Sequence, residues 1–275
     1  MERSGRSRFP FGKWHNTPMT NSTSIATFRQ KLSSGHFCIG TAITFTDPTV
    51  SAALADSLDF LWIDTEHAMM SMEAVRGHVL AGQAHNTPVL VRVPGSGMQW
   101  LKPALDSGAD GVIVPQVYSA EEARGVVADC RYPPMGRRGF GPRVPSNFAR
   151  ISPTEFIAQA NREVFVAVQI ETAEALQQVD EILAIEGLDS VVIGPFDLSA
   201  ALGFPGQPEH PQVLAAIADI VQKAKIAGKS VGAGGGADMG YVKRMAERGI
   251  QWQQSGNDYE YLIRYADSLT KHVRG

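Results

Sequence analysis

The chain alternates eight short apolar runs with segments of helical periodicity, and this alternation most constrains its fold. The apolar runs span Phe37–Ile43, Phe60–Asp64, Pro88–Val93, Gly111–Pro115, Val164–Ile170, Ser190–Gly194, Lys229–Ala233 and Ile250–Ser255. The helix-like segments span Pro48–Ser57, Met72–Ala84, Gly97–Ser107, Ala120–Cys130, Ala173–Leu183, Pro211–Ala227, Met239–Arg248 and Tyr259–His272. Apolar strands that each precede a helix are typical of a parallel sheet buried on both faces. Eight such units predict a closed (β/α)8 TIM barrel, an α/β fold of roughly 250 residues.

The alternative architecture is an open, doubly wound sheet. Such a sheet normally starts with a Gly-rich phosphate-binding turn, and neither GxGxxG nor GxxxxGK[ST] occurs in this sequence. The absence of that turn favours the barrel.

Composition limits the classes of partner and the compartment that we expect for this protein. The net charge is −3, and Lys and Arg residues are scattered beyond the N-terminus, which argues against nucleic acid or a membrane surface as a partner. The two cysteines, Cys38 and Cys130, form no CxxC or zinc-like spacing, so we expect a reducing compartment. A cytoplasmic protein is the simplest interpretation.

The N-terminal residues differ from the rest of the chain. Met1–Ser24 carries four basic residues and one acid among Ser, Thr, Asn and Pro, without the apolar stretch of a secretory signal. We expect residues 1–24 to form a disordered or loosely docked tail and residues 25–275 to form a single barrel domain. Organelle targeting by the basic tail is the lesser alternative.

Two carboxylates follow successive predicted strands. Glu171 comes directly after Val164–Ile170, and Asp197 follows Ser190–Gly194 by three residues. The C-terminal ends of barrel strands carry the active site in TIM-barrel enzymes, so these two acids can hold a divalent cation there. Each acid alone could instead cap the following helix, where the helix dipole stabilises a negative charge.

Further polar residues end the second, third and fifth predicted strands. Asp64 ends the second strand, and Glu66 and His67 follow it. Arg92 lies on the third strand, and Gln169 is the penultimate residue of the fifth. An Arg guanidinium can hold a carboxylate or an oxyanion, and a His beside an acid can move protons near neutral pH. The set suits a small anionic 2-oxo acid. The structural alternatives are a buried barrel histidine and a salt bridge that closes the mouth.

Two further features of the sequence bear on the site: the positions of the lysines, and the long connection between the fourth and fifth predicted strands. Schiff-base chemistry needs an amine at the C-terminal end of a strand, but Lys229 lies at the N-terminal end of its strand, which argues against imine catalysis. The connection before the fifth strand is the longest, and long loops are often functional. We expect it to carry Arg137, Arg138 and Arg143 over the mouth.

The ordered strand-end blocks resemble the metal-dependent 2-oxo-acid aldolases. The matching blocks are Asp64–His67, Val91–Pro94, Arg131–Pro134, Gln169–Glu171 and Gly194–Ser199. They are similar to the signatures of the hydroxy-heptenedioate aldolase and citrate lyase-like group, which includes macrophomate synthase. The resemblance runs from about Phe37 to Val273, and the ordered set is far more specific than any single block.

The resemblance implies roles for individual residues. It implies a divalent metal, most simply Mg²⁺ with Mn²⁺ or Co²⁺ as alternatives, held by Glu171 and Asp197 and chelated by pyruvate. It implies that Arg92 stabilises the enolate oxygen and that His67 with Asp64 transfers protons. The residues implied beside the substrate are Gln169, Gly194, Pro195 and Phe196. Asp106 matches a position that approaches a neighbouring subunit's site, and relatives commonly exchange their last helix and form hexamers.

These observations predict a class II carbon–carbon lyase. The expected reaction cleaves or forms 4-hydroxy-2-oxo acids through a metal-bound pyruvate enolate, with an aldehyde as second partner, and also decarboxylates oxaloacetate. Three alternatives remain: a macrophomate synthase-like enzyme, a citryl- or malyl-CoA-type lyase, and a non-catalytic binding barrel. Gly232–Gly236 and Gln251–Ser255 are respectively more glycine-rich and more polar than usual in the resembled family, which leaves the acceptor open.

Overall fold

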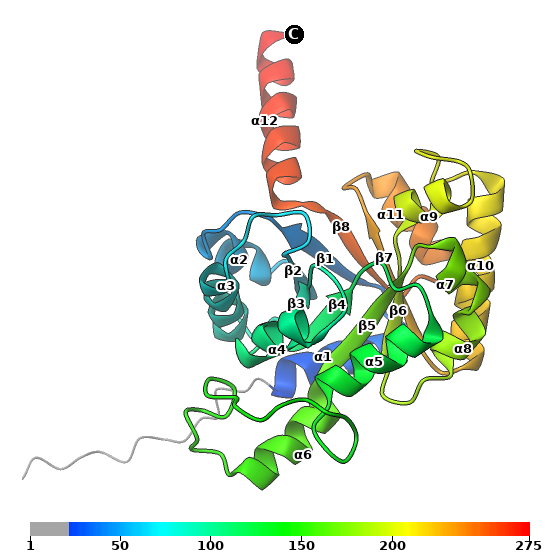
Figure 1. The fold of residues 1–275 in the computed structure, drawn as a ribbon. Helices are drawn as coiled ribbons and strands as arrows, with labels where there is room; N and C mark the ends of the chain where they lie inside the picture. Colours follow the sequence, from blue (N-terminus) through cyan, green and yellow to red (C-terminus); the bar gives the residue numbers. More distant parts are fainter. Residues whose placement is uncertain (1–21) are drawn as a thin grey trace, which may run out of the picture.

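The computed structural model, which describes residues 22–275, is a closed barrel of eight parallel strands in sequence order, surrounded by helices (Figure 1). Each strand pairs in parallel with its neighbour, and β1 pairs with β8 to close the barrel. The strands are β1 Cys38–Ile43, β2 Phe60–Asp64, β3 Val89–Arg92, β4 Gly111–Val114, β5 Phe165–Ile170, β6 Ser190–Ile193, β7 Ser230–Gly235 and β8 Trp252–Asn257. The predicted (β/α)8 barrel is confirmed.

The helices agree with the predicted segments in most places. They are α1 Ser22–Ser33, α2 Thr49–Ala55, α3 Met72–Ala84, α4 Met98–Asp106, α5 Ala120–Cys130, α6 Pro153–Glu163, α7 Ala173–Gln177, α8 Val179–Leu183, α9 Pro195–Ala201, α10 Pro211–Ile226, α11 Met239–Glu247 and α12 Asp258–Arg274. The segment predicted as one helix over Ala173–Leu183 is broken at Gln178. The sequence analysis did not predict three helices, α1, α6 and α9.

Helix α1 closes the N-terminal end of the barrel. The Phe28 ring lies 5.4 Å from Phe60, 5.6 Å from Phe165 and 6.1 Å from Trp252 between ring centroids. Gly232 provides room for this cluster, because a Cβ there would overlap the Trp252 indole. The N-terminal end of the barrel interior is therefore filled by packed apolar side chains, and we look for the polar site at the C-terminal ends of the strands.

The boundary of the expected N-terminal tail needs adjustment. The prediction for residues 1–21 lies outside the described residues, whereas residues 22–24 already belong to α1. Ser24 and Ile25 are buried, and they pack α1 onto the barrel.

Helix α12 projects away from the barrel (Figure 1). Its first residue, Asp258, is buried and anchors it, because the Asp258 carboxylate accepts hydrogen bonds from the backbone N–H groups of Thr44 and Phe45 at 2.8 and 2.9 Å. Beyond this anchor the helix exposes its apolar residues, including Leu262 at 61% and Leu269 at 54%. Within residues 22–275, no helix has both the length and the apolar character needed to cross a bilayer.

The long fourth connection lies at the N-terminal end of the barrel, so the expectation that it covers the mouth is wrong. It follows α5 and leads through α6 into β5, and Arg131 donates to the carbonyl oxygen of Val164, just before that strand, at 2.7 Å. Arg138 pairs with Asp106 at 2.7 Å, and Arg137 pairs with Asp129 at 2.6 Å. The prediction failed because the long stretch between β4 and β5 contains helices. Its extra residues follow α5, at the N-terminal end of the barrel, and do not lie between β4 and α5 at the mouth.

Candidate active site

Asp64 and Arg92 form the centre of the polar mouth. They occupy paired positions on β2 and β3, and both side chains are largely buried. Arg92 Nε and Nη2 donate to Asp64 Oδ1 and Oδ2 at 3.0 and 2.8 Å, in a two-point ion pair. The guanidinium carbon lies 5.4 Å from the Trp62 ring centroid, so the cation also stacks on an aromatic face. Arg92 therefore does form the salt bridge of the structural alternative. Because a guanidinium has five N–H donors, this pairing leaves others available to a ligand.

Glu66 and His67 extend this network toward solvent. Arg92 Nη1 lies 2.9 Å from Glu66 Oε2, and His67 Nε2 lies 3.5 Å from the same oxygen. The His67 side chain is 68% exposed, so it is not the buried histidine of the structural alternative. Asp64 holds the loop itself, since its Oδ1 accepts the backbone N–H groups of Glu66 and His67 at 3.0 and 3.4 Å. The acid beside the imidazole is thus Glu66, whereas Asp64 orients Arg92.

Glu171 is fixed from two neighbouring strands. Its Oε1 accepts the backbone N–H of Gln116, which follows β4, at 2.7 Å, and its Oε2 accepts Gln169 Nε2 at 2.6 Å. Glu171 is 5% exposed and Gln169 is 4% exposed. Gly194 permits this arrangement, because a Cβ at that position would overlap Glu171 Oε2. The glycine that precedes α9 therefore makes space for the carboxylate on the adjacent strand.

Asp197 lies in the first turn of α9 and is exposed. It lines a groove of about 420 Å³ together with Glu171, and the same groove is bordered by Gln116, Tyr118 and Glu174. Pro195 is buried at the start of α9, whereas Phe196 is 56% exposed. The structure thus brings both predicted metal ligands to one open groove at the C-terminal ends of β5 and β6.

Negative charge concentrates at this groove. Burial raises the pKa of Glu171, the nearby Asp197 and Glu66 charges raise it further, and the Gln116 and Gln169 hydrogen bonds oppose the shift. Burial also raises the pKa of Glu66, against the lowering effect of Arg92. A cation in the groove would favour the ionised form of both acids.

The groove fits a divalent cation with few protein ligands. Among residues 22–275, no group of three or more His, Cys, Asp and Glu side chains is arranged around one metal position. Mg²⁺ commonly uses only one or two carboxylates and completes its shell with water and substrate oxygens. Glu171 and Asp197 match that donor set, and the buried Gln169 Oε1, which has no hydrogen-bond partner, offers a further polar atom beside them.

Asp106 is not part of this mouth within the single chain. It is the last residue of α4, at the N-terminal end of the barrel, where it pairs with Arg138. Its expected role at a neighbouring subunit's site stays a prediction.

Sequence reasoning missed one contributor and undervalued another. Gln116 contributes a backbone N–H, which residue type cannot reveal; the available signal was its position two residues after the end of β4. Glu66 was visible as an acid beside His67, but its ion pair with Arg92 depends on how the loop after β2 folds back. Both contacts join segments that are distant in the sequence.

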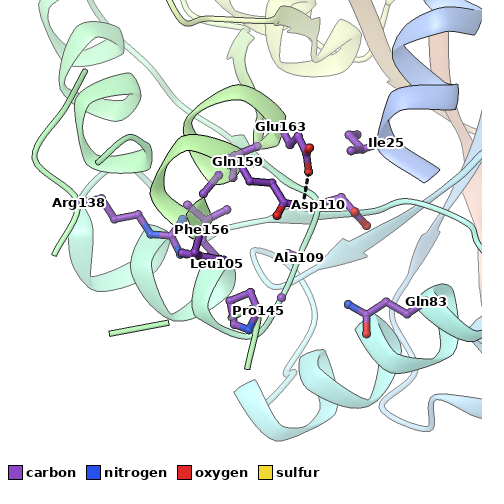
Figure 2. Close-up of a pocket in the computed structure, with 13 residues that line it drawn as sticks. Ile25, Gln83, Leu105, Ala109, Asp110, Arg138, Pro145, Phe156, Gln159 and Glu163 are labelled. Carbon is purple, nitrogen blue, oxygen red and sulfur yellow. Dashed lines mark hydrogen bonds between the residues drawn. The ribbon is translucent and has the colours of Figure 1, made fainter. Parts of the chain in front are cut away.

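A second cavity lies at the opposite end of the barrel (Figure 2). It has a volume of about 70 Å³ and is lined by Asp110 and Glu163 together with residues of α1, α4 and α6. Asp110 Oδ2 accepts the Val89 N–H at 2.9 Å, and burial raises the pKa of Asp110 to about 7. Neither Glu171 nor Asp197 lines this cavity, so it is separate from the groove of the candidate site.

A family model described as HpcH/HpaI aldolase/citrate lyase matches residues 45–264. The chain belongs to this family. A hydroxypyruvate/pyruvate aldolase from Pseudomonas aeruginosa is 35% identical over 249 residues, which cover 90% of this chain and 92% of that protein. A 4-hydroxy-2-oxo-heptane-1,7-dioate aldolase from Salmonella dublin is 37% identical over 245 residues, covering 88% and 92%.

Among solved structures, macrophomate synthase has a similar fold. Its structure superposes on this chain with a TM-score of 0.78 at 25% sequence identity, and the match covers 92% of this chain and 88% of macrophomate synthase. The resemblance derived from the strand-end blocks is confirmed. Because the curated relatives are aldolases, the chain is an enzyme of the carbon–carbon lyase class.

Proposed function

We propose that this HpcH/HpaI aldolase is a divalent-metal-dependent pyruvate lyase. The observation that carries the proposal is the pairing of Glu171 and Asp197 in one groove. Glu66, which pairs with Arg92, lies near enough for its charge to act on Glu171. These two acids would hold Mg²⁺, or Mn²⁺ or Co²⁺ in its place. A bound divalent cation supplies Lewis acidity that polarises the keto group of a 2-oxo acid.

Arg92 would stabilise the developing enolate. Its planar cation is held rigidly by Asp64 and Glu66, so little reorganisation is needed when negative charge forms on the substrate oxygen. The remaining guanidinium N–H groups can donate to that oxygen. Gln169 would lie beside the pyruvate portion, because its amide shares the buried floor with Glu171.

His67 would move the proton in aldol cleavage. The base takes the proton of the C4 hydroxyl, the C3–C4 bond breaks, and the released aldehyde leaves the pyruvate enolate to be protonated at C3. Glu66 lies near the imidazole and can stabilise the imidazolium, while Asp64 fixes the loop that carries His67. Decarboxylation of oxaloacetate forms the same enolate without removing a hydroxyl proton.

The substrate class follows from the relatives. Their names point to pyruvate and hydroxypyruvate as 2-oxo acids, with 4-hydroxy-2-oxo acids as cleavage substrates. The macrophomate synthase likeness supports the alternative that the enolate is used for a different carbon–carbon bond. We propose a cytoplasmic homo-oligomer, in the form of a hexamer, with Asp106 completing a neighbour's site.

The decisive test is a pyruvate-release assay. The enzyme is incubated with 4-hydroxy-2-oxo acids of differing chain length and with oxaloacetate, with added Mg²⁺ or with excess chelator. Metal-dependent pyruvate release from both kinds of substrate is expected. Full activity in excess chelator, or a borohydride-trapped lysine adduct with pyruvate, contradicts the proposal.

A further inference from the structure

Gln116 has a backbone conformation that is costly for its residue type. Its φ is 51°, in the left-handed region that L-residues with a side chain rarely adopt. Among residues 22–275, the other non-glycine residues with positive φ are Asn86, in the turn before β3, and Asn147–Ala149, in the long segment before α6. Gln116 is thus the member of this set at the C-terminal ends of the strands. Unfavourable backbone geometry persists where surrounding contacts require it, and it often lies at functional sites.

The contact associated with this geometry is the hydrogen bond to Glu171. The Gln116 N–H donates to Glu171 Oε1 at 2.7 Å, whereas the other carboxylate oxygen is held by Gln169. Gly194 leaves room for Oε2 on the far side. Two donors from different segments therefore fix the rotation of one buried carboxylate. A hydrogen bond from a backbone N–H to an ionised carboxylate is charge-assisted and stronger than a neutral one.

Because Glu171 is buried among like charges, loss of the hydrogen bond from the Gln116 N–H should affect its position strongly. The carboxylate is 5% exposed and has Asp197 and Glu66 nearby, so water cannot replace a lost donor easily and like charges tend to turn the group away. An extended backbone at residue 116 would direct its N–H elsewhere. Glu171 would then keep only the Gln169 hydrogen bond, and its carboxylate would be less firmly held in the groove.

We propose that Gln116 is a positioning residue: its left-handed backbone aims an N–H at Glu171 and holds that carboxylate in the orientation that binds the divalent cation. The inference rests on the proposed metal function of Glu171 and adds a residue that contributes through its main chain. The Gln116 side chain is dispensable for this role.

Three substitutions separate the backbone from the side chain. Gln116→Gly keeps the N–H and adopts positive φ without strain. Gln116→Val keeps the N–H but disfavours positive φ, because it is β-branched. Gln116→Pro removes the N–H and sets φ near −65°. The readout is direct binding of Mn²⁺ alone, measured by the loss of the free-ion electron paramagnetic resonance signal, with no turnover involved.

The Gly variant is expected to bind Mn²⁺ within roughly threefold of the unmodified enzyme, whereas the Val and Pro variants lose on the order of 10- to 100-fold, as for one hydrogen bond to a charged group. Asn86→Val is the matched control: it imposes the same strain at φ 54° in the turn before β3 and should leave Mn²⁺ affinity unchanged. Circular dichroism verifies folding, and the Val variant carries the test if the Pro variant does not fold.

Two results overturn the proposal: equal affinity in the Val variant and the unmodified enzyme, or equal losses in the Gly and Val variants. The unmodified enzyme distinguishes this failure from failure of the proposed function. If it does not bind Mn²⁺ at all, the metal site itself is refuted.

Discussion

Asp64 and Arg92 face the mouth from paired positions on β2 and β3 and meet through two parallel hydrogen bonds of 3.0 and 2.8 Å. Neighbouring parallel strands in register place these side chains at the same height, so the fork of Arg92 matches both Asp64 oxygens. The pair is nearly buried, which means that each charge depends on the other. The Arg92 guanidinium is therefore held in a fixed position at the strand ends in the absence of substrate.

Replacing Arg92 with Lys should slow every pyruvate-forming reaction by on the order of 10²-fold, because an ammonium cannot keep the planar fork on Asp64 and also reach an enolate oxygen. The rates of aldol cleavage and oxaloacetate decarboxylation should fall together. Both are measured by pyruvate release, well below the unfolding temperature. Loss of only one reaction would contradict a role in enolate stabilisation.

Glu171→Ala and Asp197→Ala should each weaken Mg²⁺ or Mn²⁺ binding by more than roughly 100-fold, since each removes one of two protein ligands. Isothermal titration with the metal alone measures this. Glu174→Ala is the control, because Glu174 is an exposed acid that lines the same groove. An equal loss in the control would indicate diffuse electrostatic attraction in place of ligation.

His67→Ala should slow aldol cleavage by about 10²-fold or more and should spare decarboxylation of oxaloacetate, which needs no base for a hydroxyl proton. The comparison is made by measuring kcat for both substrates on the same preparation. Met69→Ala changes an almost fully exposed side chain on the same loop and should alter neither rate. A parallel loss in both reactions would leave His67 as a structural or substrate-binding residue.

Helix α12 should carry the oligomer interface. Replacing Leu262 and Leu269 with Gln removes exposed apolar surface and should produce smaller species with lower activity, while the barrel stays folded. Light scattering and circular dichroism measure the two properties. Lys271→Gln, an exposed polar change on the same helix, serves as the control. A fully active monomer would refute the shared site.

The shared site has its own test in mixed oligomers. If Asp106 completes a neighbour's mouth, an inactive Asp106→Ala variant mixed with an inactive Glu171→Ala variant should regain part of the activity after subunit exchange. No recovery, with mixed oligomers demonstrated, would confine Asp106 to its pairing with Arg138.

Stability should fall as pH rises toward and through about 7, because of Asp110 in the cavity of Figure 2. Its pKa is raised to about 7 in the folded chain, whereas the carboxyl of the unfolded chain ionises near pH 4. The unfolded state is therefore favoured increasingly between these two pH values, and the dependence levels off once the folded Asp110 ionises. Asp110→Asn should flatten this dependence and stabilise the protein by on the order of 1–2 kcal/mol at pH 8. Urea unfolding at pH 5 and pH 8 measures it. An unchanged pH slope in the variant would assign the effect to other groups.

Part of the candidate site was predictable from the sequence for a specific reason. In a parallel barrel every strand ends at the same face, so Asp64, Arg92, Glu171 and Asp197 converge wherever each follows an apolar run. Their types then indicate the chemistry. The apolar runs also predicted all eight strands, with β2 matching residue for residue.

Other contacts could not be read from the chain. Arg138 was expected over the mouth, yet the long segment follows α5 and packs at the N-terminal end of the barrel, since a count of residues does not say on which side of a helix the extra length falls. The preference of Glu66 over Asp64 as the neighbour of His67 likewise depends on how one loop folds back.

The sequence by itself determined the barrel, its strand order and the residue types at its mouth, because hydrophobic periodicity and strand polarity are local properties that the closed fold repeats eight times. Only the tertiary structure decided which oxygen meets which donor. Glu171 is held by the main chain of Gln116 across 55 residues, and Gly194 leaves the space that this requires. Such contacts depend on the register between strands and on the backbone conformation of single residues, and neither is encoded in the identity of one side chain.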